Sequence, residues 1–491
     1  MDDLEILLTD FLKEKKKEKK QKESKDHLPT IFVKQLLADA SLEFWHDPGD
    51  NSYCTYKTNN GWETWPVCSA RFEAFLRERW IASFASIVPS ATLANIQEEL
   101  SARSLHAHLY DPQVRVNSFN DKIYLTMADP SWRVIEVDSE GWRLLAKAPF
   151  PTIKQSHAES YPTPLPGGSI DLLKKYFLYN MNEDTFKLVI GFILSCFRQT
   201  LEYPILVING TQDSGKSTIT NMILRIVDPC KSTAARPPTK ESDLGVSAIH
   251  RHLLAYDNLS SLSPDMSDAI CCLSTGYTAN LRKLYTNGEI YTYTIHRPVI
   301  LNGISALVHR DDLARRTIGI YLAANGGAKQ PPELLEREFR TDLPYIFGAL
   351  LDALSSSLKY ESSVKLGLVE GLLSVANWVE ASHLFPEGNF THIYNKNREA
   401  LSLMLLESDD LVRLILEMMK DKHHLYCTFD SFVADAVFYK KHQVSALKSS
   451  VSFFNRLERI KPGLARFKLN VVELGRDNVT GDRRFSIHKC V

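Results

Sequence analysis

One eight-residue segment, Gly210–Ser217, has the residue types and spacing to bind phosphate groups. Its sequence, GTQDSGKS, matches the pattern G-x-x-x-x-G-K-[ST] and lies between an apolar stretch and a helical stretch. The glycines let the backbone curl until successive N–H groups point at phosphate oxygens, beside a helix N-terminus that favours anions. We therefore predict a Walker A loop, with the Lys216 ammonium on the β- and γ-phosphates of ATP and the Ser217 hydroxyl on Mg²⁺. The predicted nucleotide-binding residues are Gly210, Thr211, Gln212, Asp213, Ser214, Gly215, Lys216, Ser217 and Thr218.

Two further apolar stretches end in polar residues that suit the same reaction. LLAY is followed by Asp257 and Asn258, and PVIL is followed by Asn302. A carboxylate at the end of a neighbouring strand can hold Mg²⁺, so we predict this role for Asp257. Asn258 can orient water but cannot accept its proton, so either another acid is the base or hydrolysis is slow. The Asn302 amide can hydrogen-bond both the γ-phosphate and the attacking water.

The elements that carry these residues must meet at one edge of a sheet. We predict a strand over 204–209 before the loop and a helix over 218–227 after it. Residues 229–308 alternate helical stretches with short apolar strands. The predicted fold class is therefore α/β, with a parallel sheet covered by helices.

A hairpin is predicted between the last two motifs, in the stretch TGYTANLRKLYTNGEIYTYTI. Asn287 and Gly288 form the preferred two-residue turn between alternating β-formers, and Arg282 and Lys283 lie just before it. These cations either contact DNA or belong to an ordinary surface hairpin.

The Walker A segment, LLAYDN and PVILNG follow one another in the order and spacing of superfamily 3 helicases, and the chain resembles this AAA+ P-loop family. The resemblance implies an ATPase with catalytic roles for Lys216, Asp257, Asn258 and Asn302. It also implies that the hairpin with Arg282 and Lys283 projects into a central pore and grips a single DNA strand.

The segment DLARRTIGIYL resembles the arginine-finger segment of the same family. By register we favour Arg316 over Arg315 as the cation that reaches the nucleotide of the next subunit. Such a finger acts only at a subunit boundary, so the resemblance implies a homo-oligomeric ring, a hexamer in this family. The alternative is a surface salt bridge made by these arginines.

A wider resemblance, from about residue 40 to the end, links the chain to primase-helicases of phages, plasmids and integrated elements. It rests on HDPGD, ETWP, the stretch 254–265, LYTNGE and PVILNGI. Many relatives carry a primase domain in front. The first 165 residues show no paired-carboxylate polymerase motif, so we do not expect nucleotide polymerisation.

The C-terminal segment predicts a second DNA contact. Residues 445–458 form an amphipathic helical pattern, and LNVVEL and RRFSIH are typical of strands. Together they indicate a winged-helix-like unit that binds duplex DNA, with Arg476, Arg483 and Arg484 on phosphates. The alternative is a basic module that packs against the ring.

Charge and composition divide the chain further. Residues 13–25 hold eight Lys against three Glu, after a short amphipathic helical pattern, and form either an arm for a replication partner or a solvated helix end. The Pro-rich stretch YPTPLPGG marks a boundary. The predicted units are 1–28 (arm), 29–165 (N-terminal α/β domain), 166–330 (AAA+ P-loop core), 331–430 (helical segment) and 431–491 (winged-helix-like domain).

The bulk sequence excludes several classes of protein. With 44% hydrophobic and 24% charged residues, the chain is neither disordered nor fibrous. The longest apolar run, 188–197, is about half the length that crosses a bilayer, and the start of the chain is acidic, so we expect a cytoplasmic protein with no membrane contact. The eight cysteines have no C-x-x-C spacing, so we expect reduced thiols and no zinc site.

The sequence thus predicts an ATP-dependent DNA helicase for replication of a mobile element. Two alternatives stay open. One is a DNA-binding regulatory ATPase of a defence or transposition system that does not unwind DNA, which Asn258 favours. The other is a replication-initiation loader that acts through its N-terminal arm.

Overall fold

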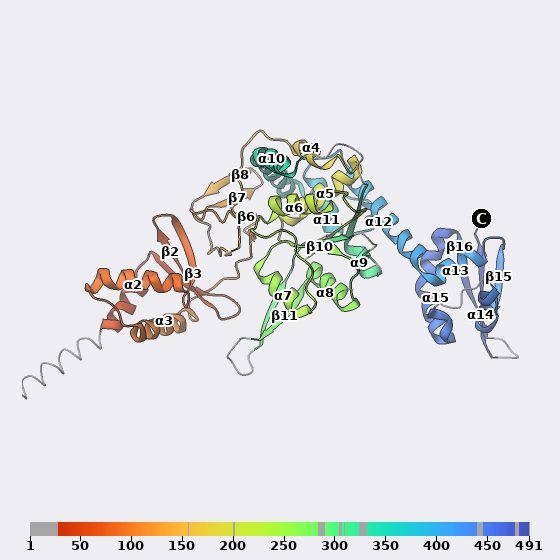
Figure 1. Ribbon diagram of the computed structural model, residues 1–491, viewed down its shortest axis with the longest axis horizontal. Helices are drawn as coiled ribbons and strands as arrows, with labels where there is room; N and C mark the ends of the chain where they lie inside the picture. Colours follow the sequence, from red (N-terminus) through yellow and green to blue (C-terminus); the bar gives the residue numbers. More distant parts are fainter. Residues whose placement is uncertain are drawn as a thin grey trace, which may run out of the picture.

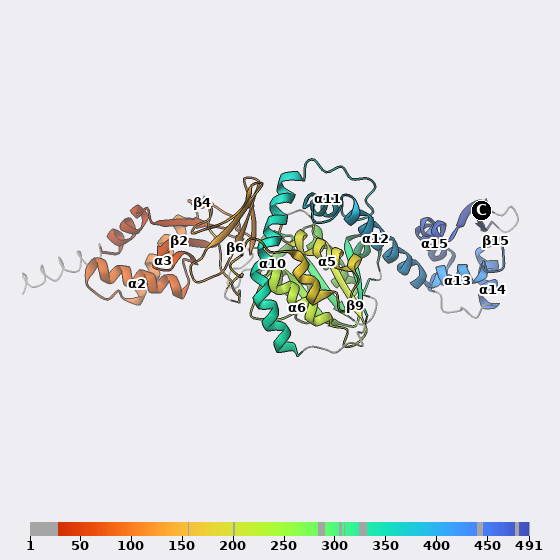
Figure 2. The ribbon, with the colours of Figure 1, turned by 90° about the horizontal axis from the view of Figure 1, so that it is seen from above.

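The computed structural model arranges the chain as three units in a row along its longest axis (Figures 1 and 2), and each unit has an apolar core of its own. The structure describes residues 28–155, 157–199, 202–282, 290–303, 307–308, 310–323, 331–438, 445–476 and 481–490. The predicted lysine-rich arm lies outside the described residues. No helix in these ranges is long and apolar enough to cross a bilayer.

The N-terminal unit is a small antiparallel sheet covered by helices. After a helix over 28–38, strands β1 (Leu42–His46), β2 (Ser52–Thr58) and β3 (Gly61–Pro66) form a meander, and β4 (His108–Leu109) pairs in parallel with β1. Helices α2 (Ala70–Phe84) and α3 (Ser90–Ser104) pack on it through their buried apolar residues. The Ser69 hydroxyl accepts a hydrogen bond from the Phe72 N–H, which caps the start of α2.

A second meander connects this unit to the centre of the molecule. It consists of β5 (Val116–Phe119), β6 (Lys122–Thr126), β7 (Val134–Asp138) and β8 (Gly141–Leu145). Its apolar side chains, among them Leu125 and Ile135, belong to the central core, and Trp142 donates a hydrogen bond of 2.9 Å to Asp352. Residues before and after position 165, where a domain boundary is expected, therefore belong to the same central core.

The centre is a four-stranded parallel sheet in the order β10-β13-β9-β14. Its strands are β9 (Ile205–Gly210), β10 (Leu254–Leu259), β13 (Val299–Gly303) and β14 (Thr317–Leu322). Along β9, Leu206 and Ile208 belong to one apolar cluster, whereas Ile205 and Val207 belong to another. Successive side chains of a strand point to opposite faces, so both faces of this sheet are buried.

Helices cover both faces of the sheet, as the sequence predicts (Figure 1). The first cluster contains α5 (Glu183–Cys196), α6 (Lys216–Val227), α10 (Pro332–Tyr360) and α11 (Leu373–Ala381), and the second contains α7 (Glu241–His250) and α8 (Pro264–Thr275). The stretch before α5 is a 3-10 turn, η1 (Ile170–Leu173), followed by the short α4 (Lys174–Phe177).

The predicted helical segment 331–430 is mostly but not entirely helical. Helices α12 (Asn389–Ser408) and α13 (Asp410–Met418) follow α11, but residues 361–372 between α10 and α11 and residues 382–388 between α11 and α12 have no helix. In Figure 2, α12 runs from the central body toward the C-terminal unit. Asp409 caps α13 by accepting hydrogen bonds from the N–H groups of Leu411 and Val412.

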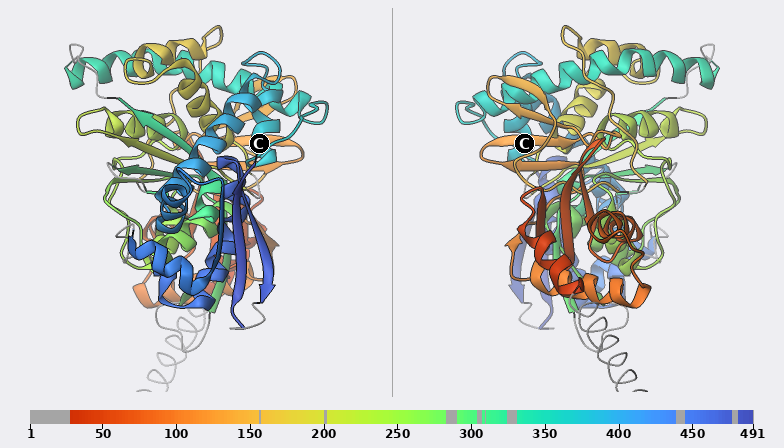
Figure 3. Two further views of the ribbon diagram at one scale, coloured as in Figure 1. Left: turned by 90° about the vertical axis from the view of Figure 1, so that its right-hand side faces the viewer. Right: turned by 90° about the vertical axis from the view of Figure 1, so that its left-hand side faces the viewer.

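The C-terminal unit combines helices with a small antiparallel sheet in the order β15-β17-β16, whose strands stand side by side in Figure 3. Its elements are β15 (His424–Thr428), α14 (Phe429–Phe438), η2 (Ser445–Lys448), α15 (Ser450–Leu464), η3 (Ala465–Phe467), β16 (Leu469–Arg476) and β17 (Arg483–Lys489). The helical pattern expected over 445–458 is present as η2 and α15, and the two final strands are present as β16 and β17. The strand β15 is not predicted, and the apolar core of this unit begins at Leu411, before residue 431.

Candidate nucleotide and nucleic-acid sites

The predicted phosphate loop connects β9 to α6 at the carboxyl edge of the parallel sheet. Gly215 adopts φ +85°, and Asp213 adopts φ +60°, so the loop curls through left-handed backbone before α6 begins at Lys216. A Cβ atom at Gly210 would lie 2.5 Å from the Leu322 carbonyl oxygen. Glycine is therefore required at both positions, for conformation at Gly215 and for close approach at Gly210.

The Lys216 ammonium lies over the loop itself. Its Nζ donates hydrogen bonds to the carbonyl oxygens of Gly210 at 3.0 Å and Thr211 at 2.6 Å. Partial burial lowers the pKa of Lys216, and the negative charges of Asp257 and Asp213 oppose this shift. The structure thus brings Asp257 within electrostatic reach of Lys216, although 41 residues separate them in sequence.

A β-bulge places Asp257 and Asn258 at the end of β10. The pairing of β10 with β13 shifts register between Tyr256 and Leu259, and Asn258 adopts φ +60°. The Asp257 N–H donates a hydrogen bond of 2.8 Å to the Ala235 carbonyl oxygen. Residue 235 therefore pairs with β10 on the side that faces away from β13. Asparagine tolerates left-handed backbone better than most residues. The left-handed backbone at the bulge therefore suits Asn258 and would be strained with most other side chains.

The bulge gives a testable prediction for Asn258. We expect Asn258→Gly to keep ATP turnover within about twofold, since glycine adopts the same φ without cost. Asn258→Glu should lower the free energy of unfolding by about 1 kcal/mol through backbone strain. Asp257→Ala should eliminate turnover. Steady-state ATP hydrolysis and thermal unfolding of the three variants measure these effects. A tenfold or larger loss of turnover in folded Asn258→Gly would instead assign the side-chain amide a role in orienting water.

Asn302 lies beneath α6 rather than in the open part of the site. It is fully buried at the end of β13, between β9 and β10, and its Nδ2 atom donates a hydrogen bond of 3.3 Å to the Thr220 hydroxyl. Thr220 in turn donates to the Lys216 carbonyl oxygen at 2.9 Å. The Asn302 Oδ1 atom is buried and accepts no hydrogen bond from a described residue. Asn302 is therefore connected to the loop helix through Thr220.

The predicted hairpin is present as an antiparallel pair. Strands β11 (Tyr277–Arg282) and β12 (Ile290–Ile295) pair from Tyr277–Ile295 to Arg282–Ile290, and they extend from the central body in Figure 1. Arg282 is the last residue of β11. Lys283 and the predicted Asn287–Gly288 turn lie outside the described residues.

The two candidate finger arginines differ in exposure. They end α9 (Asp311–Arg316), which leads into β14, and Arg315 is exposed whereas Arg316 is half-buried. The Arg316 Nη1 atom donates a hydrogen bond of 2.8 Å to the Asp312 carbonyl oxygen, and its Nε atom has no partner among the described residues. A residue that reaches another subunit must be accessible, so exposure favours Arg315, whereas the sequence register favours Arg316.

The three C-terminal arginines are not equivalent. Arg483 forms an ion pair of 2.6 Å with Glu473, and its guanidinium lies over the Phe454 ring at 4.3 Å. Arg476 is exposed, and Arg484 donates a hydrogen bond of 3.4 Å to the Arg476 carbonyl oxygen. The charge of Arg483 is therefore partly neutralised within the unit. Sequence reasoning did not single out the exposed polar side chains of α15, which include Ser452, Asn455 and Arg459.

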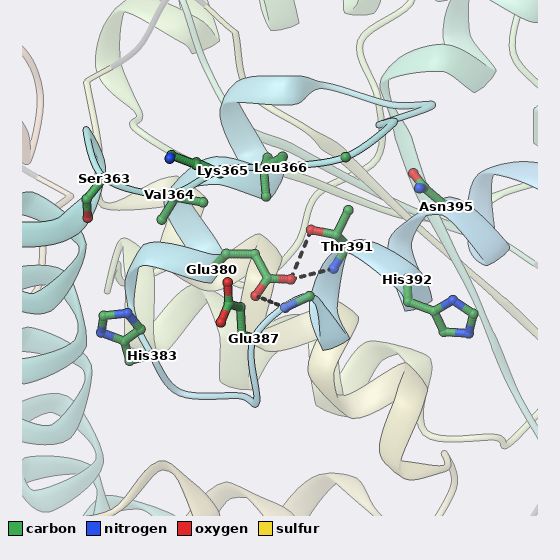
Figure 4. A pocket seen from close by; sticks show the side chains of 12 residues that line it. Ser363, Val364, Lys365, Leu366, Glu380, His383, Glu387, Thr391, His392 and Asn395 are labelled. Atoms are coloured by element: carbon green, nitrogen blue, oxygen red, sulfur yellow. Dashed lines mark hydrogen bonds between the residues drawn. The ribbon is translucent and has the colours of Figure 1, made fainter.

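A hollow of about 770 Å³ lies away from the phosphate loop, where the ends of α10, α11 and α12 come together (Figure 4). Its most buried acid, Glu380, accepts hydrogen bonds from the N–H groups of Gly388 and Thr391 and from the Thr391 hydroxyl. These contacts hold the turn between α11 and α12. Glu380 therefore has a structural role, and the hollow is not a candidate for the ATP site.

Sequence reasoning missed two residues that contact the phosphate loop. Tyr179 and Asn180, in the connection from α4 to α5, lie against Ser214 and Gly215. They precede the Walker A segment by about thirty residues and belong to no recognisable motif, so no local signal in the sequence indicates this contact.

Comparison with solved structures gives weak overall matches. The structure described as "SCCmec type IV Cch - active helicase" aligns over 91% of this chain and 92% of its own, with 10% identity and a TM-score of 0.48. Two structures of the NrS-1 C terminal region align over 93% and 94% of this chain and 98% and 99% of theirs, with 10% and 12% identity and TM-scores of 0.41 and 0.39. No curated protein sequence matches the chain.

One family model matches the centre of the chain. Residues 170–367 match the actinomycete integrative conjugative element replication protein. This match agrees with the predicted resemblance to replication proteins of integrated elements, while the narrower resemblance to superfamily 3 helicases stays a prediction. The matched segment contains the phosphate loop, Asp257, Asn302 and α9, so the family model covers the whole candidate nucleotide site.

Proposed function

We propose that this chain is an ATPase that translocates on DNA during replication of a mobile genetic element. The observation that carries the proposal is the phosphate loop at the carboxyl edge of a parallel sheet, with Lys216 within electrostatic reach of Asp257. The match of residues 170–367 to a replication protein of integrative conjugative elements supports a role in the replication of such an element.

The residues present fit ATP with Mg²⁺. Ser217 is exposed at the start of α6, and Asp257 is half-buried with its charge near Lys216, so a hydroxyl and a carboxylate are available as ligands for a hard cation. Bound Mg²⁺ would neutralise charge on the phosphate oxygens. The Lys216 ammonium would exchange its contacts with the loop carbonyls for the β- and γ-phosphates. Asp257 would orient the attacking water, and Asn302 would respond to the γ-phosphate through Thr220 and the start of α6.

The DNA contacts belong to two places in the chain. In a homo-oligomeric ring, most simply a hexamer, the hairpin of β11 and β12 would present Arg282 and Lys283 to a single strand in the pore. Arg316 or Arg315 would complete the site of the next subunit. The C-terminal unit would bind duplex DNA as a winged helix through Arg476 and Arg484, with a smaller contribution from Arg483.

The experiment that tests the proposal uses Lys283→Ala. We expect this variant to keep basal ATP hydrolysis within about twofold but to lose DNA stimulation and strand displacement. The slope of log binding constant against log salt concentration should fall by about one for each phosphate that is no longer neutralised, independently of DNA sequence. Lys57→Ala, which removes an exposed lysine of β2, is the matched control and should change none of these quantities.

Normal strand displacement by Lys283→Ala with an unchanged salt slope would contradict a hairpin motor. ATP hydrolysis by the unmodified chain without any strand displacement would favour the second candidate, a DNA-binding regulatory ATPase. The observation behind that candidate is the absence of a carboxylate at Asn258, because an amide cannot accept the proton of the attacking water.

A further inference from the structure

We propose that Tyr179 is the platform on which the nucleotide base stacks, and that Asn180 is a positioning residue that fixes the phosphate loop. The inference rests on the proposed ATP site and extends it from the phosphates to the base. Both residues belong to the connection between α4 and α5, which contacts the loop from outside the β9–α6 unit.

Asn180 is attached to the loop by a buried hydrogen bond. Its Nδ2 atom donates to the Ser214 carbonyl oxygen at 2.7 Å, and the residue is 6% exposed. Ser214 directly precedes Gly215, whose left-handed backbone turns the chain into α6. Fixing the Ser214 carbonyl therefore fixes the direction of the N–H groups that follow it. A buried hydrogen bond at this point orders the loop before any ligand binds.

Two polar atoms beside this hydrogen bond are unsatisfied. The Asn180 Oδ1 atom and the Ser214 hydroxyl are buried and have no hydrogen-bond partner among the described residues. Unpaired buried polar atoms are rare and costly in folded proteins, and strained or unsatisfied groups occur preferentially where ligands bind. Both atoms lie beside the loop, where a ligand or a water molecule can pair with them.

Tyr179 provides an aromatic surface next to the loop. Its hydroxyl would lie 2.5 Å from a Cβ atom at Gly215, so the hydroxyl end of the side chain reaches the loop as closely as a glycine allows. The side chain is nevertheless 40% exposed. Burial of part of the residue raises the pKa of the Tyr179 hydroxyl above its usual range.

The chemistry of the ligand explains an exposed ring at this place. The N–H groups of the loop and the start of α6 bind phosphates, so the sugar and base must extend from the loop over neighbouring residues. Every nucleobase presents a π face that stacks on aromatic side chains without regard to its hydrogen-bonding edge. A partly exposed tyrosine in contact with the loop is suited to this contact, whereas Tyr256 on β10 is only 4% exposed and cannot offer its face.

The test compares a ligand that has a base with one that lacks it. We would titrate the full chain and its Tyr179→Ala and Tyr179→Phe variants with ATP and with inorganic tripolyphosphate, both with Mg²⁺, and measure Kd by calorimetry. Stacking on one ring corresponds to about a tenfold change in Kd, so Tyr179→Ala should weaken ATP binding by about that factor and leave tripolyphosphate binding unchanged. Tyr179→Phe should bind both ligands normally.

Two comparisons complete the design. Asn180→Ala should weaken the binding of both ligands by the same factor, since both bind to the phosphate loop. Tyr426→Ala, which removes an exposed tyrosine of β15, should leave the binding of both ligands unchanged. If Tyr179→Ala weakened the binding of ATP and of tripolyphosphate equally, Tyr179 would only support the loop. The proposal that the base stacks on Tyr179 would then be wrong. Failure of the unmodified chain to bind either ligand would overturn the proposed ATPase itself, and the base platform with it.

Discussion

Lys216→Ala is expected to reduce ATP turnover by about two to three orders of magnitude while the protein stays folded. The ammonium is the cation of the phosphate loop, and its Nζ atom already lies within 2.6 Å and 3.0 Å of two loop carbonyl oxygens. Removing it leaves the negative charge on the transferring phosphoryl group without its nearest protein cation. The turn itself should persist, because it depends on Gly210 and Gly215 rather than on the lysine side chain.

Steady-state ATP hydrolysis, ATP affinity and thermal unfolding of the same preparation measure this effect. Lys57→Ala removes one positive charge at an exposed position of β2 and should leave hydrolysis unchanged, which separates a local effect from a change in net charge. Undiminished turnover by folded Lys216→Ala would rule out the phosphate-loop assignment. If Lys216→Ala does not fold, Lys216→Met, which keeps an unbranched apolar side chain but removes the charge, provides a second measurement.

The sequence indicates most residues of the candidate nucleotide site because the signals for that site are local. The Gly210–Ser217 loop carries its own conformational requirements, and the apolar stretches before Asp257 and Asn302 have the length and composition of buried strands. Pairing of β9, β13 and β10 in parallel then brings the ends of these stretches to one edge. Short-range patterns therefore suffice for the parallel sheet and for the strand, loop and helix that contain the predicted phosphate loop.

Other features depend on contacts between distant parts of the chain, which local patterns do not encode. The meander of β5 to β8 lies within the segment 29–165 that the sequence predicts as a separate domain, yet its apolar face packs into the central core. The bulge at Asn258 is visible only in the register between β10 and β13. Likewise, Tyr179 and Asn180 reach the phosphate loop because α5 and α6 share that core.

A buried ion pair shows how strongly such long-range contacts connect the central region. Arg115, at φ +65° before β5, is 3% exposed, and its Nε atom lies 2.9 Å from the carboxylate of Asp228 at the end of α6. Arg115 also donates hydrogen bonds to the carbonyl oxygens of Glu159 and Pro229. The second Asp228 oxygen accepts hydrogen bonds from the N–H groups of His252 at 2.9 Å and Leu253 at 3.2 Å. One carboxylate therefore joins the loop helix, the meander and the segment that leads into β10.

Arg115→Met should therefore destabilise the central core by about 3–5 kcal/mol, because it leaves the Asp228 carboxylate buried without its counter-charge. Since the chain has several cores, unfolding need not be two-state. In calorimetry, the unfolding temperature of the central core should fall, while that of the C-terminal core should stay unchanged. Arg103→Met is the control: its pair with Glu99 is exposed, with an N–O distance of 2.7 Å, and it should cost at most about 1 kcal/mol.

The ligand dependence of this transition connects stability to the proposed site. ATP that binds the folded core should raise its unfolding temperature in the unmodified chain and also in Arg115→Met, since the loop residues themselves are unchanged. A central transition that moves no more in Arg115→Met than in Arg103→Met would mean that water or local rearrangement compensates for the missing guanidinium. In that case the meander would be attached to the core by its apolar face, and the contact of Asp228 with His252 and Leu253 would alone join α6 to the segment leading into β10.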